Sequence, residues 1–536
     1  MITAKAVLLL TSVAAGVFVR FQPQSLLLAL LGWVTCNLGY AVFRVFVYPF
    51  YFSPFRHLPE PSGGSFPWAH ADLIRVSNNG EPYRQWINST PNNGLIKFRV
   101  LMNQERLLLT SPEALREVLV TKAYQFVKPP EPAFLLQKLL GNGILVSEGE
   151  EHKRQRKHLM PAFSFRHIKD LYPIFWSKAK ECVDAIAADQ TYKNGPRGQQ
   201  LAAQEAYDWA QRATLDIIGL AGMSHDFQAI ADPNGVATST YKEMLGEEGP
   251  LFFYTSLGVD LPVQWIVELP TRHFNKIRKA VNKIRKIASD LISEKHRRIA
   301  DGKVRENDIL SIAIESGGFS DEDLVNQMMT FLAAGHETTA SALTWATYLL
   351  CQNPEIQTRL RNEIRSNIAP LSDPQSDDAI QQIDQLPLLN AVCNEVLRVM
   401  PSVPMTIRDA IEDTEILGTF VPKGTRIFVA AWAVNVSHEL WGQDALTFNP
   451  DRWLGPGKAN TGGAQSNFSN LTFIHGPRSC IGKDFAKAEF LHLLAAWVGR
   501  FNLRFEDKEI SKSIIGWVTA RPEHKLPIVF ERIEGW

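Results

Sequence analysis

One cysteine near the C-terminal end lies among residues that would suit it to hold a bound group through a thiolate. Residues 473–482 read Phe-Ile-His-Gly-Pro-Arg-Ser-Cys-Ile-Gly, with the cysteine at Cys480. Apolar residues at helical spacing follow, so the sequence predicts a helix just after Cys480, whose N-terminus would favour negative charge. Gly476 and Gly482 would let the backbone approach something flat and bulky, and Arg478 could pair with an anionic group on it. Together these features suit a macrocyclic iron with carboxylate arms.

These ten residues match a known signature at every fixed position. The stretch resembles the haem-binding sequence Phe-x-x-Gly-x-Arg-x-Cys-x-Gly of the cytochrome P450 haem-thiolate monooxygenases. Five specified residues match by chance in about 10⁻⁴ of chains of this length. The alternative, a buried structural cysteine, leaves the glycines and the arginine unexplained. The resemblance implies haem b with Cys480 as the axial thiolate, and cofactor-binding positions at Phe473, Gly476, Arg478 and Gly482.

A long helix is predicted to begin after Ser320 and to carry a polar motif at its middle. Ser320 and Asp323 resemble a capping box, and the helical pattern runs to about Cys351, which gives about 30 residues and ~45 Å. Residues 334–339, Ala-Gly-His-Glu-Thr-Thr, cost helix propensity, so something else must keep them there. Taken alone, these residues are equally consistent with a polar patch on the helix that has no catalytic role.

In the cytochrome P450 family a similar Ala-Gly-x-Glu/Asp-Thr motif passes over the oxygen-binding face of the haem. The resemblance implies that Gly335 makes room for O2 and loosens the helix. The Thr338 hydroxyl is then expected to bond outward rather than back to its own helix. Glu337 and Thr338 are the catalytic pair that the resemblance implies, and they would relay protons during O2 activation.

Three further basic residues are candidates for contacts with haem. The helix predicted from Gly149 resembles the family's Trp-x-x-x-Arg helix, whose two side chains reach a haem propionate. Arg156 fits this pattern, whereas His152 stands where Trp is usual, and both lie on one helix face. Arg408 matches a strand arginine of the family that pairs with a propionate. The alternative for the helix is a solvated basic face, part of which could meet a redox partner.

A predicted helix carries Glu395 and Arg398 one turn apart, a spacing that normally means a surface salt bridge. The resemblance implies instead a buried triad with Arg452, which lies in Phe-Asn-Pro-Asp-Arg-Trp at residues 448–453. Such a triad would hold the cysteine loop in place, because losing one member leaves a buried charge unpaired. We therefore expect structural rather than catalytic roles for Glu395, Arg398 and Arg452.

Composition narrows the class of protein. The chain has 536 residues, of which 45% are hydrophobic, enough for a sizeable core. Its 56 basic and 56 acidic residues balance, which gives no electrostatic argument for binding nucleic acid. The five cysteines are scattered without disulfide or zinc spacing, as is typical of a reducing compartment.

The first residues have the pattern of a membrane anchor. An apolar run at residues 6–19 ends at Arg20, and residues 25–43 then carry no charge over about 28 Å of helix, nearly a bilayer core. A cleaved signal peptide and a buried core helix are the alternatives. We predict an anchor of one or two transmembrane helices at residues 1–48, a proline-rich hinge at residues 49–67 and the catalytic domain at residues 68–536.

Basic residues beyond the anchor predict the side of the membrane on which the catalytic domain lies. Arg44, Arg56 and His57 follow the uncharged run and favour the cytosolic side. Resemblance to microsomal members of the family implies the endoplasmic reticulum membrane.

The fold expected from the resemblance is mainly α, with a small β subdomain. Residues 66–103 mix short β-branched runs with turns, including residues 95–100, and predict a small sheet. The chain has no flavin or nicotinamide fingerprint, so electrons from NADPH would come through a separate flavin reductase. A haem-thiolate isomerase or dehydratase that uses no O2, or a non-catalytic haem binder, would have little use for Glu337 and Thr338.

Family position also implies which residues would line a substrate pocket: Phe331, Ala334, Val403, Met405, Ile515 and Trp517. Most are apolar, so a lipophilic small molecule is expected. The chain resembles filamentous-fungal members that tailor polyketides, terpenoids or alkaloids, and a fatty-acid or xenobiotic hydroxylase is the alternative.

Overall fold

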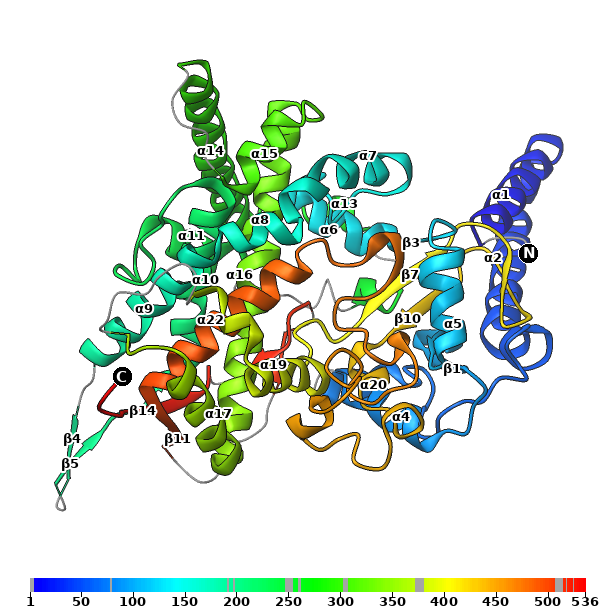
Figure 1. Cartoon of the computed structure of the whole chain (residues 1–536). Coiled ribbons are helices and arrows are strands. Elements are labelled where there is room, and N and C mark those ends of the chain that lie inside the picture. Colours follow the sequence, from blue (N-terminus) through cyan, green and yellow to red (C-terminus); the bar gives the residue numbers. More distant parts are fainter. Residues whose placement is uncertain are drawn as a thin grey trace.

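The helix predicted around the polar motif runs through the centre of the molecule (Figure 1). In the computed structural model this helix, α16, spans Asp321–Gln352. The Ser320 hydroxyl accepts a hydrogen bond from the Asp323 N–H, and the Asp323 carboxylate accepts one from the Ser320 N–H. Both halves of the predicted capping box are therefore present, and the helix ends just before Pro354.

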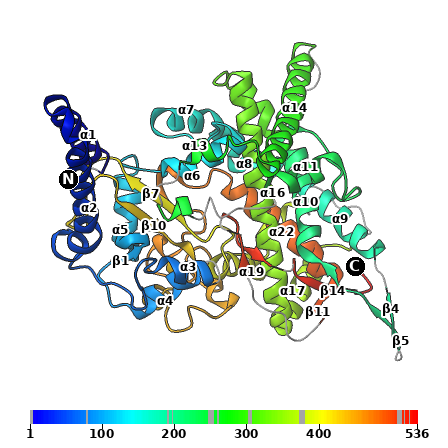
Figure 2. The same ribbon diagram turned by 180° about the vertical axis from the view of Figure 1, so that it is seen from behind.

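Other helices surround α16 and form most of the molecule (Figures 1 and 2). The structure describes residues 4–77, 80–189, 192–195, 198–245, 254–258, 262–301, 307–371, 380–506, 514–516, 518–523 and 525–536. The longer helices are α9 (Tyr172–Ala188), α10 (Ala206–Met223), α14 (Arg272–Ala300), α17 (Pro354–Asn367), α19 (Pro387–Val399) and α22 (Lys483–Arg500). The shorter ones are α3 (Ala71–Val76), α4 (Glu81–Ser89), α5 (Pro112–Arg116), α6 (Pro130–Leu140), α7 (Gly149–Leu159), α8 (Phe165–Asp170), α11 (Val236–Leu245), α13 (Val263–Ile266), α15 (Ile309–Glu315), α20 (Ala431–Val434) and α21 (His438–Trp441).

Small sheets accompany the helices, as expected. The largest has the order β1 (Leu95–Val100), β2 (Gln104–Leu109), β10 (Arg426–Val429), β7 (Thr406–Ala410) and β3 (Phe126–Val127). A second has the order β11 (Phe501–Phe505), β14 (Pro527–Arg532) and β6 (Gln204–Glu205). The remaining pairs are β4 (Tyr192–Gly195) with β5 (Gly198–Leu201), β8 (Thr414–Ile416) with β9 (Thr419–Val421), and β12 (Ile514–Ile515) with β13 (Arg521–Pro522).

The two larger apolar cores among the described residues match this division. The larger one joins the long helices and buries Trp345 of α16 and Trp497 of α22. The smaller one lies on the large sheet, where the Phe98 and Phe428 rings meet edge to face at 5.1 Å. Both rings belong to strands of this sheet, so their burial helps to hold β1 and β10 in one core.

The prediction of a small sheet over residues 66–103 is wrong for its first half. Strand β1 occupies residues 95–100 as expected, but α3 and α4 precede it. Tyr83, Trp86 and Ile87 of α4 are buried, and their spacing puts them on one helix face against the sheet core. The bulky residues that favour strands here serve an amphipathic helix instead.

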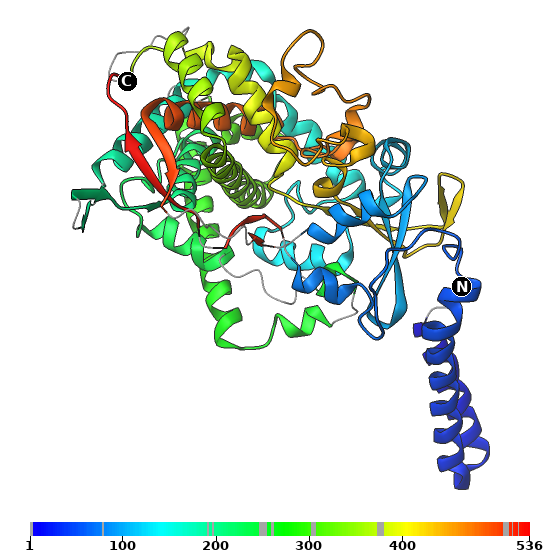
Figure 3. The same ribbon diagram turned by 90° about the horizontal axis from the view of Figure 1, so that it is seen from below.

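Two N-terminal helices project from the rest of the molecule as a pair (Figure 3). They are α1 (Ala4–Phe21) and α2 (Leu26–Val42), and α2 continues as a π-helical segment over Phe43–Phe52. Among the described residues, Pro23–Phe52 is the one helix long and apolar enough to cross a membrane, and Ala6–Phe21 is a shorter apolar helix.

The segment predicted as a hinge at residues 49–67 packs on the catalytic domain. Phe55 is buried in the core of the large sheet. Glu60 forms ion pairs with Arg99 at 2.5 Å and Lys97 at 3.3 Å, both on β1. Its prolines therefore shape a docked segment rather than a free linker.

Candidate active site

The cysteine loop, residues 471–482, folds back on itself directly before α22. The Cys480 N–H donates to the Phe473 carbonyl oxygen at 3.0 Å, and the Ser479 N–H donates to the Gly476 carbonyl oxygen at 3.0 Å. Helix α22 begins at Lys483, as the apolar spacing predicts. The thiol of Cys480 is thus held at the N-terminal end of a helix of 18 residues.

Gly476 is needed because of a neighbouring backbone segment of the same chain. Its φ is +82°, and a Cβ there would lie 2.0 Å from the Leu119 carbonyl oxygen in the π-helical segment Glu117–Thr121. Gly482 has an ordinary φ of −88°, and a Cβ there would meet only Phe163 at 3.8 Å. Within the protein itself a close backbone approach therefore occurs at Gly476, and the approach of both glycines to a bound macrocycle stays a prediction.

The side chain of Cys480 is open to solvent on one side, while protein atoms on the other side reduce the hydration of its sulfur. This loss of hydration raises the pKa of the thiol, whereas the Gly482 N–H and the charge of Arg156 lower it. Among the described residues, no group of three or more His, Cys, Asp or Glu side chains could hold a metal ion. A metal bound at Cys480 would therefore need its other ligands from elsewhere, and the nitrogens of a macrocycle could supply them.

The two predicted residues of α7 differ in their contacts. Arg156 donates to the Ser479 carbonyl oxygen at 2.7 Å and to the Ser479 hydroxyl at 3.2 Å, so it grips the loop beside Cys480. His152 is buried, and its Nδ1 lies 3.3 Å from the Tyr124 hydroxyl. Burial, followed by the nearby charge of Lys128, lowers the pKa of His152 to about 4. The His152 ring is therefore neutral at pH 7 and can contribute a hydrogen bond but no positive charge.

Several buried or partly buried cationic side chains lie near His152, and the most buried of them is Arg408. Arg408 of β7 is 4% exposed and donates to the Thr406 hydroxyl and the Ile407 carbonyl oxygen, both at 2.7 Å. Burial, followed by the charge of Arg478, lowers the pKa of Arg408 to about 10. Arg408 therefore stays charged at pH 7, and within the described chain it forms no ion pair.

Two more cations complete this group, which we call the basic cluster: Lys128, Arg408 and Arg478. Lys128 lies 3.2 Å from a Glu148 oxygen, and Arg478 also pairs with Glu148. Burial, followed by the charge of Arg408, lowers the pKa of Lys128 to about 8. One carboxylate thus faces three cations in the described part of the chain. The excess of positive charge in a buried place suits an anionic ligand.

The middle of α16 is accessible along one line only. Ala334 is exposed and Thr338 half-buried, while most residues around them on the helix are buried. The Thr338 hydroxyl donates back to the Ala334 carbonyl oxygen at 2.8 Å, so the expected outward hydrogen bond is wrong for this structure. This back-bond satisfies the hydroxyl locally, as is common for Thr inside helices.

Gly335 faces a different neighbour from the one expected. A Cβ at Gly335 would lie 3.0 Å from Cγ1 and Cδ1 of Ile218 on α10. The glycine therefore allows α10 and α16 to pack closely, and the accessible space lies next to Ala334. The expected role of Gly335 in making room for O2 stays a prediction, and the exposed side of the helix is at Ala334 and Thr338.

Glu337 points to another side of α16 and lies against the C-terminal strands. Its carboxylate is 3.4 Å from Nη1 of Arg521 on β13, and this nitrogen also donates to the Tyr207 hydroxyl at 3.3 Å. The three side chains line a cavity of about 280 Å³, together with His336 and Ile515. Burial lowers the pKa of His336 to about 4, so its ring is neutral and stacks edge-on against Tyr241. The cavity is large enough to hold several water molecules beside Glu337.

The predicted substrate-pocket residues are only partly brought together. Ala334 is exposed beside Thr338, and the Ser402 hydroxyl bonds the Thr338 carbonyl oxygen at 2.6 Å, which brings the segment with Val403 and Met405 next to it. Ile515 lines the cavity at Glu337. Phe331 is buried edge-on against Phe163, and Trp517 lies outside the described residues.

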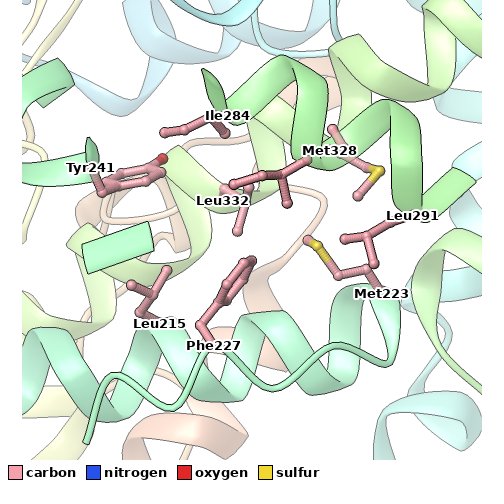
Figure 4. A pocket seen from close by; sticks show the side chains of 10 residues that line it. Leu215, Met223, Phe227, Tyr241, Ile284, Leu291, Met328 and Leu332 are labelled. Atoms are coloured by element: carbon pink, nitrogen blue, oxygen red, sulfur yellow. The ribbon is translucent and has the colours of Figure 1, made fainter. Parts of the chain in front are cut away.

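A second, smaller cavity lies between α10, α14 and α16 (Figure 4). It holds about 10 Å³ and is lined by apolar side chains such as Leu215, Met328 and Leu332, together with Tyr241. None of the predicted site residues lines it. Its size corresponds to about one water molecule, so it is a packing space rather than a substrate pocket.

Glu395, Arg398 and Arg452 are in contact, and Glu395 and Arg398 are fully buried. Two Arg398 nitrogens donate to the two Glu395 oxygens at 2.7 and 2.8 Å, and Arg452 donates to Glu395 at 3.0 Å. The Trp453 indole also donates to Glu395, at 2.8 Å. The predicted triad geometry is present, and two further donors, Trp453 and the Asn449 N–H at 2.9 Å, satisfy the remaining carboxylate capacity.

Asn435 connects this triad to the cysteine loop. Arg398 donates to the Asn435 carbonyl oxygen at 2.8 Å, and the Asn435 side chain accepts from the Leu471 N–H at 2.7 Å and donates to Thr472 at 3.0 Å. Leu471 and Thr472 directly precede Phe473. Sequence reasoning missed this residue, as it missed Lys128, Glu148, Tyr124 and Arg521, because no local pattern marks them.

Comparison with known proteins places this site in a family. The family model described as Cytochrome P450 matches residues 83–529. The chain belongs to the cytochrome P450 family. It is 43% identical to "Cytochrome P450 monooxygenase sphH" of Aspergillus fumigatus, over 92% of this chain and 91% of that relative. It is 40% identical to "Cytochrome P450 monooxygenase ALT8" of Alternaria alternata (94% of each chain), and 41% identical to "Cytochrome P450 monooxygenase FUM15" of Gibberella moniliformis (88% and 87%).

The protein is therefore an oxidoreductase, a cytochrome P450 monooxygenase, and its family uses haem-thiolate iron, O2, a redox partner and a small-molecule substrate. The residues present fit haem. A thiol stands exposed at a helix N-terminus, and a buried basic cluster with excess positive charge matches the two propionates of the macrocycle. This charge excess has no structural use in the protein alone, because buried charge is costly without a partner.

Proposed function

We propose that this cytochrome P450 inserts one oxygen atom from O2 into a lipophilic small molecule, with electrons from NADPH delivered by a separate flavin reductase. Two electrons and two protons would reduce the other oxygen atom to water, so the product gains one oxygen and NADPH is oxidised. The observation that carries the reaction class is the placement of Thr338 on the accessible line of α16, next to a Glu337 that lines a cavity.

Haem b would be held by residues from three segments: the cysteine loop, β7 and the segment around Lys128. Cys480 would supply the axial thiolate, and Arg408, Arg478 and Lys128 would bind the propionates. Arg156 would hold the loop through Ser479, and its predicted contact with a propionate stays a prediction. When bound, thiolate-ligated haem iron supplies the O2 activation on which the reaction depends.

Proton delivery would be the task of Glu337 and Thr338. Glu337 would take protons from water in the 280 Å³ cavity and pass them across the helix toward the Thr338 hydroxyl. Arg521 holds the Glu337 carboxylate on the cavity side, so delivery requires this ion pair to loosen. The Thr338 hydroxyl, bonded to Ala334 at rest, would rotate to donate into the accessible space.

The substrate proposed is a fungal secondary metabolite such as a polyketide, a terpenoid or an alkaloid. The relatives named above come from fungi, and Val403, Met405 and Ile515 are apolar positions suited to a lipophilic molecule. The product would carry a hydroxyl, an epoxide or the result of several oxidations. A fatty-acid or xenobiotic hydroxylase is the second candidate.

We also propose the endoplasmic reticulum membrane as the location, with the catalytic domain in the cytosol. The apolar helix Pro23–Phe52 supports the anchor, and Arg44, Arg56 and His57 near its end support the orientation. The domain boundaries that follow are an anchor at residues 1–48 and a catalytic domain at residues 68–536, with residues 49–67 docked on that domain.

A turnover screen in membranes tests the proposed reaction. Wild type and Cys480→Ser would each receive a flavin reductase, NADPH, ¹⁸O2 and a host metabolite extract, followed by mass spectrometry. We expect a product heavier by one ¹⁸O atom with the wild type and none with the variant. A product of unchanged mass, or one formed without NADPH, would favour an isomerase or dehydratase instead.

A further inference from the structure

The two N-terminal helices meet along one face of each. In α1 the less exposed positions include Val7, Thr11, Ala15 and Val19, which recur every four residues. In α2 they include Ala29, Trp33 and Asn37, with the same spacing. Residues four apart share a helix face, so each helix presents one stripe to the other. The small side chains in both stripes allow close packing of helices in a membrane.

Two hydrogen bonds tie these stripes together across the helix pair. The Asn37 amide donates to the Thr11 hydroxyl at 3.0 Å, and it also donates to the Trp33 carbonyl oxygen at 2.8 Å. The Trp33 indole donates to the Ser12 hydroxyl at 3.0 Å. In hydrocarbon no water can satisfy such groups, so the contacts of Trp33 and Asn37 with α1 supply hydrogen bonds that the bilayer cannot.

The rest of the pair's surface is apolar and exposed. Leu8, Leu9 and Leu10 of α1 are at least half exposed, as are Leu27 and Leu30 of α2. Among the described residues, only Pro23–Phe52 is long and apolar enough by itself to cross a membrane; the 18 residues of α1 extend about 27 Å, slightly less than the hydrocarbon core, so α1 would depend on its pairing with α2. A helix pair with polar contacts inside and leucines outside suits a lipid bilayer rather than water.

The register of the contacts fixes which ends lie together. Pairing of Thr11 with Asn37 and of Ser12 with Trp33 makes the helices antiparallel, and it brings the start of α1 level with the end of α2, near Arg44. In Figure 3 the N label lies at the end of the pair that adjoins the catalytic domain. The opposite end carries the uncharged turn at residues 22–25 and, in the last turn of α1, a single basic residue, Arg20.

We propose that α1 and α2 enter the membrane together as a helical hairpin, so that the start of α1 and the catalytic domain lie on the same side. This inference rests on the proposed membrane anchoring and is independent of the proposed reaction. A single-span anchor would instead put α1 on the far side and leave Asn37 without its Thr11 partner in the bilayer.

Protease protection in sealed microsomes tests the topology of the full-length protein. Epitope tags before α1 and after the C-terminus would be exposed to protease with and without detergent. We expect both tags to be digested without detergent. An N-terminal tag that is protected until detergent is added, or that is missing from the mature chain, would overturn the hairpin. Release of the whole chain by alkaline carbonate would instead overturn the anchoring on which it rests.

Cysteine cross-linking tests the contact itself, in a Cys36→Ser background. Thr11→Cys with Asn37→Cys should cross-link within the chain in membranes, because these side chains are in contact. The matched control is Val13→Cys with Leu38→Cys, two positions that are 56% and 63% exposed. We expect cross-linking at least several-fold stronger for the first pair. Equal cross-linking of the two pairs would contradict the hairpin.

Discussion

Arg408 is positively charged and buried, and it forms no ion pair with the described residues. It is almost fully buried, and within the described chain its guanidinium bonds only neutral oxygens. Arg478 and Lys128 add like charge nearby, and Glu148 offsets only part of it. A buried cation without an anionic partner costs free energy, so its presence points to an anion that binds there.

Arg408→Gln should therefore weaken haem retention. A lost hydrogen bond to a charged group costs about 1.5–3 kcal/mol, so haem transfer to an acceptor apoprotein should be about 10 to 100 times faster. Arg359→Gln is the control, because Arg359 pairs with Asp451 at the surface, where each side chain is about half exposed. Equal transfer rates in the two variants would rule out a role for Arg408 in holding haem.

In the proposed mechanism Thr338 would supply a proton on the accessible side of α16. In this structure its hydroxyl donates to the Ala334 carbonyl oxygen. To donate to a bound molecule, the hydroxyl would have to break this hydrogen bond. Its backbone carbonyl is fixed by Ser402, which limits movement of the helix at this point.

Thr338→Ala should keep bound haem and NADPH use but lose coupling to product. Without the hydroxyl, product formed per NADPH should fall about tenfold or more, with hydrogen peroxide released instead. Thr338→Ser keeps a hydroxyl and should behave like the wild type. The ratio of product to NADPH consumed is the measurement, and an unchanged ratio in Thr338→Ala would remove the assigned role.

At the scale of elements, α19 acts as a support for the cysteine loop. Its Glu395 accepts from Arg398, Arg452 and Trp453, and Arg398 reaches the loop through Asn435. The network joins α19, the 448–453 segment and the loop before α22, which lie far apart in the sequence. The element therefore fixes the cysteine position without touching the cysteine.

Glu395→Gln should leave the Arg398 charge buried without its carboxylate. Breaking such a pair costs about 3–5 kcal/mol, so we expect a much lower melting temperature and little haem-loaded protein. The surface variant Arg359→Gln should cost under about 1 kcal/mol. Thermal unfolding followed by circular dichroism compares them, and similar stability of both variants would contradict the supporting role.

The packing of α22 on α9 makes stability depend on pH. His492 is fully buried, its ring meets Tyr172 edge-on at 4.8 Å, and burial lowers its pKa to about 4. The unfolded chain would bind a proton at this residue below its usual pKa of about 6.5, so stability falls as the pH drops from about 6.5 toward 4.

His492→Phe should remove this part of the pH dependence while keeping an aromatic ring in place. Between pH 7 and pH 5 the wild type should lose about 2 kcal/mol through His492 that the variant does not lose. His152 and His336 also have lowered pKa values and remain in both proteins, so the difference isolates one group. Parallel denaturant curves at the two pH values measure it, and equal losses would contradict the lowered pKa.

At the scale of the whole molecule, the features that could be predicted from the sequence are those set by residues close together in the chain. The bounds of α16, the start of α22 and the strand at residues 95–100 follow from periodicity and capping, which act over a few residues. The cysteine loop and the triad followed from motifs that resemble those of the family. The mainly α fold with a small β subdomain is confirmed by the family match.

What the sequence did not show depends on contacts between distant segments. Gly335 faces Ile218 of α10, and Glu337 faces Arg521 of β13, neither of which any local pattern marks. The basic cluster draws on segments near residues 128, 408 and 478. Docking of residues 49–67 was missed because a proline-rich composition also suits a free linker.

The most direct test of the account is the carbon monoxide difference spectrum of the reduced protein in membranes, for wild type, Cys480→Ser and Cys351→Ser. Cys351 is a second free cysteine outside the loop, so its variant controls for loss of a thiol. We predict the red-shifted band of thiolate-bound haem in the wild type and in Cys351→Ser, and its loss in Cys480→Ser. A wild type without that band, or a Cys480→Ser variant that keeps it, would contradict the assignment of Cys480 as the haem ligand.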